Sequence, residues 1–369
     1  MNKWININKQ NLLNNLKIIS EICLPAATMP VLKSNAYGHG LQVIYDCIKF
    51  ENLDWIGVHS LEEGLTLRKL GWKKNVLIMG NLSNSDEFNS AYESHLDVII
   101  GSYEQWDLWN NLLNKPAIHL KIDTGMCRQG FLPTAISKLL QDIAKLPSTV
   151  PIKGVMTHFA DVEDNMDQIW AKHQWNQLVH VLKQLKNVRQ EPFLVHSAAT
   201  AAALVLPESR FDLCRIGIGL YGLWPGAQMP DSPLRKDMKP VLSWHARLTQ
   251  VKHVPAHSYV GYGCNYRTRR KTLIGVIPIG YFEGFPRLAG QGDVLIQGRR
   301  CQILGRICMN MMMVDLTDLP TSPQVGDIAT LIGQDGEECI TANEIAHNAQ
   351  TIHYEIVTRL QADIPRLID

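Results

Sequence analysis

The amino-acid sequence predicts an α/β fold class, with an N-terminal (β/α)8 barrel followed by a C-terminal, mostly-β domain. Three observations predict it. Eight short apolar runs recur between residues 29 and 222, and longer segments of helical pattern separate them. A proline-rich stretch follows at 224–240. The chain from 241 to 340 then has the pattern of successive β-strands divided by glycine and proline turns.

The eight runs are expected to be parallel strands. They are apolar without alternation, which is typical of strands buried on both faces, and segments such as 83–95 and 165–187 have the spacing of amphipathic helices. Eight strand-helix units close naturally into a barrel rather than an open sheet. In chain order the runs are PVLKS, DWIGVHS, NVLIMG, LDVIIGS, AIHLKIDTG, IKGVMTHF, PFLVHS and CRIGIGLYG.

The proline-rich stretch at 224–240 is the predicted linker between two domains. We therefore place the barrel at 1–235 and the β domain at 236–369. Within the β domain one helix is expected at 341–350, where Thr341 and Glu344 have the spacing of a capping box.

The composition argues against several function classes. The formal net charge is +1, and the basic segment RTRRK is short, so the chain has no electrostatic footprint for nucleic acid or an anionic membrane. The N-terminus lacks the apolar core of a signal peptide, and no stretch reaches the length of a membrane span, so a cytoplasmic protein is expected. Eight cysteines without a C-x-x-C pair predict free thiols and no metal site.

The residues at the carboxyl ends of the runs are the candidate active-site residues, because a (β/α)8 barrel has its active site at that end. The first run ends with Lys33, and Tyr37 follows it. A lysine in an enclosed barrel mouth loses hydration, which lowers its pKa and makes it nucleophilic toward a carbonyl. A Schiff base with the aldehyde of pyridoxal 5′-phosphate is the expected use. The alternative is that Lys33 only extends its amine to the barrel rim.

A phosphate group would suit four further groups near the strand ends. The backbone N–H groups of Gly217 and Ile218 and the hydroxyls of Tyr37 and Ser197 can all donate to an anion. The same glycine spacing also occurs in strands where glycine only makes room for packing. The glycines alone therefore leave both interpretations open.

Three charged or titratable residues lie within or just after other runs. His158 ends the sixth run and is either functional or a buried core histidine. Arg128 follows the fifth run and either binds a ligand or pairs with Asp123. Arg215 lies in the eighth run, beside the glycines.

Taken together, these motifs closely resemble those of the alanine racemases, the pyridoxal-phosphate enzymes of bacterial cell-wall precursor supply. The resemblance spans nearly the whole chain, and the motifs occur in the family's order. It implies interconversion of L-alanine and D-alanine, with D-alanine supplied for peptidoglycan. The matching motifs are VLKSNAYGHG, LKIDTGMCRQGF, THFA, HSAAT, RIGIGLYG, VGYGCNY, IPIGYFEGFPR, GRICMNMMMVDL and IHYEIVTRL.

The resemblance implies a two-base mechanism. Lys33 would form the Schiff base with the cofactor and act as the base on one face of the substrate, and Tyr262 would be the base on the opposite face. Arg215 would hydrogen-bond the pyridine nitrogen and keep it unprotonated, which limits side reactions. His158 would support Arg215. The phosphate would be held by Tyr37, Ser197, Gly217, Ile218 and Tyr354.

The resemblance also assigns the substrate contacts. Arg128, a planar bidentate donor, and the backbone at Met309 would hold the substrate carboxylate. Lys121 occupies a position where many members carry a carbamylated lysine, a modification that turns a cation into an anion able to orient Arg128. A narrow entry corridor would restrict the substrate to a small side chain. The residues that resemble corridor members are Tyr281, Arg287, Arg306 and Ile352.

In the family the opposite-face tyrosine comes from a partner subunit. The resemblance therefore implies a head-to-tail homodimer, with the barrel of one chain facing the β domain of the other. One position departs from the family pattern, because Met309 is followed by Asn310 where an acidic residue is usual. That departure changes the charge expected at the subunit interface and bears on the substrate range.

Three alternative functions remain on the same kind of scaffold. One is a racemase of broader amino-acid specificity, and another is a single-domain pyridoxal-phosphate homeostasis protein without established catalysis. The third is a decarboxylase of the related barrel-plus-β class. The β domain with Tyr262 argues against the homeostasis protein, and the pairing of Lys33 with Tyr262 argues against the decarboxylase.

Overall fold

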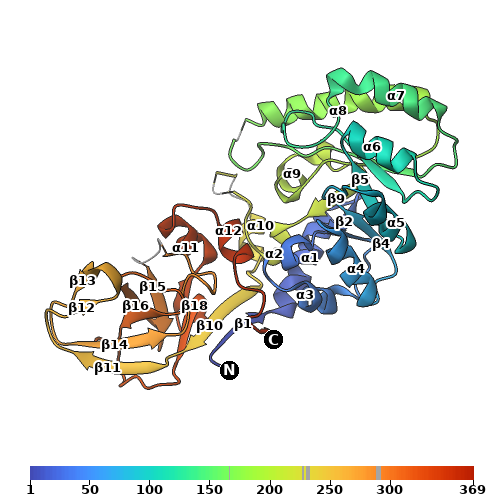
Figure 1. Ribbon diagram of the computed structural model, residues 1–369. Helices are drawn as coiled ribbons and strands as arrows, with labels where there is room; N and C mark the ends of the chain where they lie inside the picture. Colours follow the sequence, from blue (N-terminus) through green and yellow to red (C-terminus); the bar gives the residue numbers. More distant parts are fainter. Residues whose placement is uncertain (166, 227, 230–232, 288–291) are drawn as a thin grey trace. The chain divides into compact units, whose positions relative to one another are not determined.

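The computed structural model describes residues 1–165, 167–226, 228–229, 233–287 and 292–369 (Figure 1). The chain divides into two compact units. The barrel unit comprises Leu12–Ser34 and Tyr45–Lys239, and the β unit comprises Met1–Asn11, Asn35–Ile44 and Pro240–Asp369. In the described ranges, no helix combines the length and the apolar character needed to cross a lipid bilayer.

Eight parallel strands form the ring of the barrel unit, as predicted. Strands β3 to β8 pair in chain order, and β2 pairs with β9. Bridges between Val31 and Gly57 and between Ala199 and Arg215 join the two sets. The strands are β2 (Ala27–Pro30), β3 (Trp55–Val58), β4 (Asn75–Ile78), β5 (Asp97–Ile100), β6 (Ile118–Lys121), β7 (Ile152–Met156), β8 (Leu194–His196) and β9 (Leu213–Ile216).

The first barrel strand ends earlier than predicted. Strand β2 stops at Pro30, so Lys33 lies beyond the strand rather than at its end. Residues 34–37 instead have φ between 53° and 56°, which makes the short segment α2 (Lys33–Tyr37) a left-handed turn. Such a turn has no characteristic apolar period, so the strand pattern could not reveal it.

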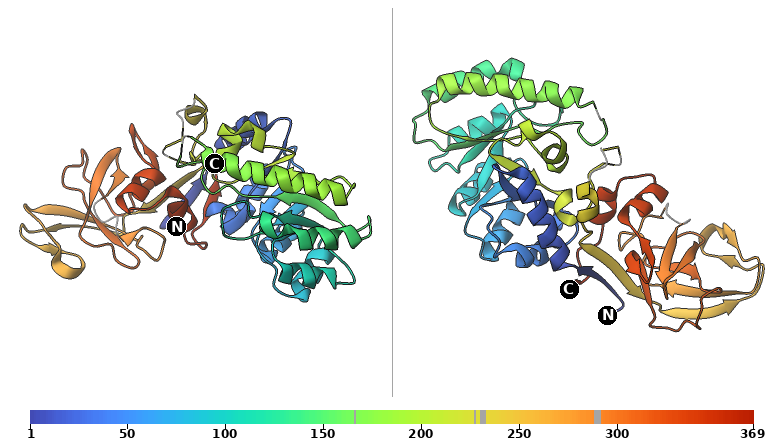
Figure 2. Two further views of the ribbon diagram at one scale, coloured as in Figure 1. Left: turned by 90° about the horizontal axis from the view of Figure 1, so that it is seen from above. Right: turned by 180° about the vertical axis from the view of Figure 1, so that it is seen from behind.

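Helices cover the outside of the ring of strands, and α7 and α8 lie side by side (Figure 2). Ser60, Asn84 and Ser102 cap helices by accepting a backbone N–H, which explains where those helices begin. The helices are α1 (Lys9–Cys23), α3 (Leu41–Ile48), α4 (Leu61–Lys69), α5 (Ser85–Glu93), α6 (Tyr103–Asn110), α7 (Ile136–Lys145), α8 (Ile169–Val188), α9 (Thr200–Val205) and α10 (Pro233–Asp237), with 3-10 turns η1 (Pro133–Ala135), η2 (Pro207–Ser209) and η3 (Ile218–Tyr221).

The predicted helices at 83–95 and 165–187 correspond to α5 and α8. Residue 166 of the second prediction lies outside the described residues. The predicted linker at 224–240 contains α10, and its residues 227 and 230–232 also lie outside the described residues.

The barrel interior is filled by both apolar and polar side chains. An apolar cluster takes one residue from each of six strands, and full burial of such a side chain contributes roughly 1.5–3 kcal/mol. Buried polar side chains share this interior, among them Asp97, His119 and His196. The apolar cluster consists of Met29, Trp55, Leu77, Ile99, Met156 and Leu213.

The β unit contains one long sheet and a small two-stranded sheet. The long sheet has the order β11-β14-β17-β16-β15-β18-β10-β1-β20, with β19 paired to β18, and β12 pairs with β13. Its strands are β1 (Lys3–Ile7), β10 (Leu242–Arg247), β11 (Gln250–Val254), β12 (Tyr259–Val260), β13 (Tyr266–Arg267), β14 (Thr272–Ile277), β15 (Asp293–Ile296), β16 (Arg299–Leu304), β17 (Met312–Asp315), β18 (Ile328–Asp335), β19 (Glu338–Ile340) and β20 (Arg366–Ile368).

Two segments from the first 44 residues belong to the β unit rather than to the barrel unit, unlike the simple division at residue 235. Strand β1 pairs antiparallel with β10 and parallel with β20, so its partners are distant in the sequence. The described residues of this unit also include the helices α11 (Ala342–Asn348) and α12 (His353–Thr358). The Thr341 hydroxyl accepts the N–H of Glu344 at the start of α11, where the capping-box spacing placed it.

Candidate active site

Five predicted site residues of the barrel unit are close enough to affect one another's protonation: Lys33, Lys121, Arg128, His158 and Arg215. Lys121 ends β6, and Arg215 lies in β9, while the other three follow strands. All are therefore at the carboxyl-terminal side of the barrel, as predicted. Their shared positive charge favours the neutral form of each lysine and of the histidine.

Lys33 has the protonation behaviour of a nucleophilic amine. Burial is the main cause that lowers its pKa, and the charges of Arg128 and Arg215 lower it further. A larger fraction of the amine is therefore neutral near pH 7 than for an exposed lysine. The neutral amine is the form that attacks an aldehyde.

The left-handed turn after Lys33 is a strained segment. Left-handed backbone costs about 1–2 kcal/mol for each non-glycine residue, and residues 34–37 include no glycine. The side chain of Asn35 accepts the N–H of Leu41 at 2.8 Å, which helps to fix the turn. At Gly38 a Cβ would lie 1.8 Å from the carbonyl oxygen of Val357, so only glycine fits there. Strain of this kind is typical of functional sites.

Arg215 is buried, and both terminal nitrogens of its guanidinium are hydrogen-bonded. Nη1 donates to the carbonyl of His196 at 2.8 Å and contacts Nδ1 of the same residue at 3.0 Å. Nη2 donates to the carbonyls of Thr157 and Ser197 at 2.8 and 2.9 Å and contacts Nδ1 of His158 at 3.2 Å. In the described part of the chain, Nε–H is left as the donor without a protein acceptor.

This geometry fits a pyridine nitrogen, which is a hydrogen-bond acceptor in its unprotonated form. Burial lowers the pKa of Arg215 to about 10, so the guanidinium still carries its charge at neutral pH. Burial also lowers the pKa of His158 well below its usual range, with the charge of Arg215 as the next cause. Neutral His158 is the form whose Nδ1 can accept from Arg215.

Lys121 lies at the end of β6 with its amine against Gln129. Nζ donates to Oε1 of Gln129 at 2.7 Å. Burial, followed by the charges of Arg128 and Arg215, lowers the pKa of Lys121 to about 8. An amine with this pKa has an appreciable neutral fraction, which is the form that reacts with carbon dioxide.

Asp123 organises the loop that carries Arg128. Its carboxylate accepts the backbone N–H groups of residues 125–128, and the bond from Arg128 is 2.9 Å long. Arg128 therefore meets Asp123 through its backbone. Arg128 is an exposed residue, and within the described ranges no ion pair joins its guanidinium to Asp123.

The phosphate contacts differ from those expected at Ser197. Its hydroxyl donates to the carbonyl of Ser209 at 2.6 Å, and a serine hydroxyl has one proton, so it does not also donate to a phosphate. Thr200 begins α9 and accepts the N–H of Gly219 at 3.4 Å, which leaves its own proton to donate. Ile218 begins η3, where a first-turn N–H has no acceptor inside the helix. Gly217 directly precedes it.

The two tyrosines predicted to bind the phosphate, Tyr37 and Tyr354, lie close together in the β unit. Their ring centroids are 6.4 Å apart. Burial raises the pKa of Tyr37, so its hydroxyl stays protonated and can donate a hydrogen bond. Tyr354 lies near the start of α12 and also contacts the ring of His353.

The second predicted base, Tyr262, is on a tight turn of the β unit with 65% of its surface exposed. It begins η4 (Tyr262–Cys264) between Gly261 and Gly263, whose φ values of 74° and 75° require a left-handed backbone. Arg306 lies against this turn, since a Cβ at Gly263 would be 2.8 Å from its Nη1.

Neighbouring loops of the β unit carry Tyr281 and Met309. The N–H of Tyr281 donates to the carbonyl of Cys308 at 3.2 Å, and that of Phe282 donates to the carbonyl of Met309 at 2.9 Å. The Arg287 guanidinium lies 5.6 Å from the ring centroid of Tyr281. Large apolar side chains are exposed on these loops and on two other segments of the unit, namely Tyr259, Tyr262, Tyr281, Phe282, Met309, Met311 and Ile352.

Asn310, which departs from the family pattern, has a defined partner. Its Nδ2 donates to Oε1 of Glu283 at 3.1 Å, and Lys3 approaches the same oxygen at 2.7 Å. Burial tends to raise the pKa of Glu283, but the bonds from Lys3 and Asn310 outweigh it and lower the pKa. An asparagine here therefore stabilises the buried carboxylate that also accepts the N–H of Gly280.

Two family models match the chain: the alanine racemase N-terminal domain over residues 7–225 and the alanine racemase C-terminal domain over residues 241–368. The chain belongs to the alanine racemase family. The alanine racemase of Leptospira interrogans is 37% identical over 99% of this chain and 95% of its own length. That of Carboxydothermus hydrogenoformans is also 37% identical, over 99% of this chain and 98% of its own length.

Solved structures of the family have the same fold. The alanine racemase of a D-cycloserine-producing Streptomyces lavendulae matches with a TM-score of 0.93 and 30% identity, covering 100% of this chain and 97% of its own. The alanine racemase of Bacillus anthracis with bound L-Ala-P matches with a TM-score of 0.90 and 29% identity, covering 100% of this chain and 95% of its own.

Sequence reasoning did not single out three residues that the structure places beside the site. Thr200 is the last residue of the HSAAT motif, and its position at the start of α9, beside Gly219, has no signature in the sequence. Gln129 was likewise only part of a motif, and its contact with Lys121 has no sequence signature. His196 lies at the end of the seventh run, and its contact with Arg215, which lies on another strand, cannot be predicted from the run alone.

Proposed function

We propose that this chain is an alanine racemase that interconverts L-alanine and D-alanine with pyridoxal 5′-phosphate and supplies D-alanine for peptidoglycan. The observation that supports it best is the pairing of Lys33 with Arg215 in one barrel mouth. Lys33 supplies an amine with a lowered pKa, and Arg215 supplies a buried guanidinium with Nε–H available. The reaction itself is inferred from the chain's membership of the alanine racemase family.

The residues present fit the cofactor. Lys33 would bind its aldehyde covalently, and Nε–H of Arg215 would donate to the pyridine nitrogen. When bound, the cofactor supplies a conjugated ring that delocalises the electron pair left behind as the α-proton departs. Because Arg215 is already bonded at Nη1 and Nη2, its donor direction is fixed before the cofactor binds. The phosphate would be held by Tyr37, Thr200, Gly217, Ile218 and Tyr354, with Ser197 left in its bond to Ser209.

Two bases on opposite faces of the substrate would carry the proton. Nζ of Lys33, in its neutral form, accepts the α-proton on one face. Oη of Tyr262 from the partner subunit gives a proton to the other face, and the two roles exchange for the reverse direction. Inversion follows because the departing and arriving protons use different faces.

Arg128 and the backbone N–H of Met309 would hold the substrate carboxylate. A guanidinium matches a carboxylate with two parallel hydrogen bonds, which orients the α-carbon between the bases. Tyr281 would contact the substrate beside them. The large side chain of Tyr281 favours a substrate as small as alanine.

We infer that Lys121 becomes carbamylated. Its pKa of about 8 supports the reaction with carbon dioxide, and the product would be an anion beside Gln129. A carbamate could accept from the guanidinium of Arg128, whereas the unmodified ammonium repels it.

A head-to-tail homodimer would complete each site. Tyr262 and Met309 are largely exposed on the β unit, although the proposed chemistry needs both of them to be sheltered from water. The barrel unit exposes its own apolar side chains beside the Arg128 loop, at Leu132, Ile169 and Trp170. Exposed apolar surfaces of this kind mark protein interfaces.

The proposed function is tested by incubating the purified protein with L-alanine and measuring D-alanine by chiral chromatography. Lys33→Ala should abolish covalent attachment of the cofactor. Tyr262→Phe should retain the attached cofactor and lose racemisation by about 10²-fold or more. Tyr259→Phe, another exposed tyrosine of the same unit, is the matched control. Full activity in Tyr262→Phe would contradict the two-base assignment.

Mixed dimers test the shared site. Coexpressed Lys33→Ala and Tyr262→Phe chains form heterodimers in which one of the two sites keeps both bases. Such a mixture should recover about a quarter of wild-type activity, although each variant alone should have about 1% or less. No recovery would contradict the assignment of Tyr262 to the partner's site. D-serine from L-serine would indicate broader specificity, and bound cofactor without any racemisation would indicate the homeostasis function.

A further inference from the structure

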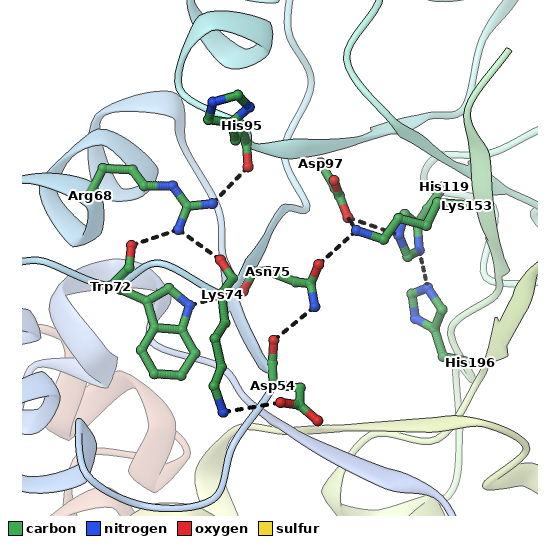
Figure 3. A network of polar contacts seen from close by, with 10 residues as sticks. All are labelled: Asp54, Arg68, Trp72, Lys74, Asn75, His95, Asp97, His119, Lys153 and His196. Atoms are coloured by element: carbon green, nitrogen blue, oxygen red, sulfur yellow. Dashed lines mark hydrogen bonds and ion pairs between the residues drawn. The ribbon is translucent and has the colours of Figure 1, made fainter. Parts of the chain in front are cut away.

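Three buried polar side chains connect the interior of the barrel to Arg215: Asp97, His119 and His196. We call them the barrel relay. Asp97 begins β5, His119 lies in β6 and His196 ends β8, and none is more than 6% exposed. Both histidines and Asp97 appear in one connected network (Figure 3). Burying a polar side chain without a hydrogen bond lowers the stability of the fold, so polar contacts are expected among these three side chains.

In the barrel relay, contacts of hydrogen-bond length join Arg215 to His119, and Asp97 follows at ion-pair distance. Nη1 of Arg215 is 3.0 Å from Nδ1 of His196, and Nε2 of that ring is 2.8 Å from Nδ1 of His119. Nε2 of His119 faces Oδ2 of Asp97 at 3.7 Å. Lys153 approaches the same Oδ2 at 2.7 Å and also donates to the side chain of Asn75 at 2.7 Å.

The guanidinium determines the direction of the two hydrogen bonds between Arg215 and His119. A guanidinium only donates, so Nδ1 of His196 must accept and its proton must be on Nε2. That N–H then donates to Nδ1 of His119, whose proton must also be on Nε2. This second N–H faces a carboxylate, which only accepts when ionised. Both imidazoles therefore have the same tautomer.

Both rings are also held neutral. Burial is the main cause that lowers the pKa of His119 and of His196. Asp97 raises the pKa of His119 in opposition, but burial with the charges of Lys153 and Arg215 outweighs it. A protonated ring at either position would place a donor against a donor. Neutral imidazoles can therefore be polarised by Asp97 without carrying a charge themselves.

We propose that the barrel relay positions Arg215 for its contact with the cofactor. The negative end at Asp97 polarises both imidazoles and strengthens Nδ1 of His196 as an acceptor. The stronger acceptor holds Nη1 of Arg215 and so leaves Nε–H as the donor that faces the ligand. This inference rests on the proposed function, because it assigns the ligand of Nε–H. The three residues are positioning residues, since they act through Arg215.

The packing around His119 supports a fixed ring. Gly154 is its direct neighbour on β7, and a Cβ at that position would lie 2.2 Å from Nδ1. The ring of Trp55 packs edge-on against His119 with centroids 5.4 Å apart. The imidazole therefore occupies space that only a glycine neighbour leaves open.

Asp97→Asn isolates the charge of the barrel relay. Because Lys153 and His119 face the same oxygen, an asparagine can present its carbonyl oxygen to both and leaves the bonds between Arg215 and His119 unchanged. His119→Phe instead removes the connection and leaves Nε2–H of His196 without its acceptor. Asp54→Asn is the matched control, since Asp54 forms a neighbouring ion pair with Lys74 through an exposed carboxylate.

Two measurements on the purified holoenzyme test the proposal. Nitrogen-15 NMR of the histidine side chains should show two rings that are neutral at pH 7 and carry their proton on Nε2. Cofactor release on dilution should show affinity weaker by about threefold in Asp97→Asn and by about tenfold or more in His119→Phe. The control should stay within about twofold of wild type.

Several outcomes would overturn the proposal. One is an Nδ1–H tautomer or a ring protonated at pH 7 in wild type, and another is wild-type cofactor affinity in both folded variants. If His119→Phe does not fold, the nearly isosteric Asp97→Asn decides. Failure of the proposed function can be distinguished from failure of this inference. If no D-alanine forms while the expected histidine tautomers are seen, the proposed function alone is wrong. If the protein is an active racemase but the tautomers differ, the barrel relay alone is wrong.

Discussion

Replacing Asp123 by asparagine should loosen the loop that presents Arg128. In wild type, Oδ1 accepts the N–H groups of residues 125–127 at 2.9–3.1 Å, and Oδ2 accepts the N–H of Arg128 at 2.9 Å. Asparagine keeps a carbonyl oxygen in place of Oδ1. Its amide nitrogen replaces Oδ2 and opposes the N–H of Arg128, so a donor faces a donor.

The expected cost follows from these four bonds. A hydrogen bond to a charged group contributes roughly 1.5–3 kcal/mol and a neutral one roughly 0.5–1.5 kcal/mol. One bond is lost and three become neutral, but the loop N–H groups regain some water and the effects of one side chain do not add. We expect a loss of about 2–4 kcal/mol in the free energy of unfolding. We also expect a higher KM for alanine, because Arg128 would be less well oriented.

The pH dependence gives an independent check. Burial tends to raise the pKa of Asp123, but the four backbone N–H groups outweigh it and hold the folded pKa below the unfolded value of about 3.9. The stabilisation from this carboxylate is therefore complete above about pH 4 and is lost as the pH falls through the folded pKa. The stability difference between wild type and Asp123→Asn should consequently shrink on acidification.

Urea unfolding at neutral and acidic pH, together with steady-state kinetics, measures both effects. Asp107→Asn, an exposed aspartate on α6, is the control for a change of one surface charge. An Asp123→Asn protein within about 0.5 kcal/mol of wild type and with an unchanged KM would refute the role given to this loop.

Three further changes have expected outcomes. Ser34→Gly should raise the free energy of unfolding by about 0.5–1 kcal/mol in a urea titration, since Ser34 is exposed at φ 56° and glycine relieves left-handed strain. Asn310→Asp should lower it by about 2–3 kcal/mol by facing buried Glu283 with a second carboxylate, and adding Glu283→Gln should recover most of that loss; no recovery would refute the pairing. With its pKa near 8, Lys121 should give a carbamate signal in carbon-13 NMR with labelled bicarbonate that grows from about pH 6 to pH 9, and Lys121→Met should abolish it.

The sequence predicted most of the barrel strands because their burial on both faces leaves continuous apolar runs. Strand β4 (Asn75–Ile78), for example, lies inside the run at 75–80. The first strand was placed too late because residues 31–32 remain apolar after the ladder ends at Pro30. Strand β1 was missed because its partners β10 and β20 are distant in the chain, and pattern alone does not report pairing.

The site was predicted less completely than the fold, for a related reason. Residues that end strands, such as Lys33 and His158, could be found from barrel geometry alone. Ser197 and Thr200 are both possible phosphate donors in the sequence. Only the structure shows that the Ser197 hydroxyl already donates to Ser209, whereas the Thr200 hydroxyl accepts from Gly219. A single histidine within an apolar run, such as His119, gives no signal until its partner on another strand is known.

Gly154 and His119 constrain the order in which their positions can change. Any side chain at 154 would need the space that the imidazole occupies, since even a Cβ would lie 2.2 Å from Nδ1. Alanine at 154 is therefore tolerated only after His119 has been replaced by a smaller residue. Once both have changed, a return to histidine is blocked until glycine is restored. Glycine at 154 and histidine at 119 are therefore expected to be retained together or replaced together during evolution.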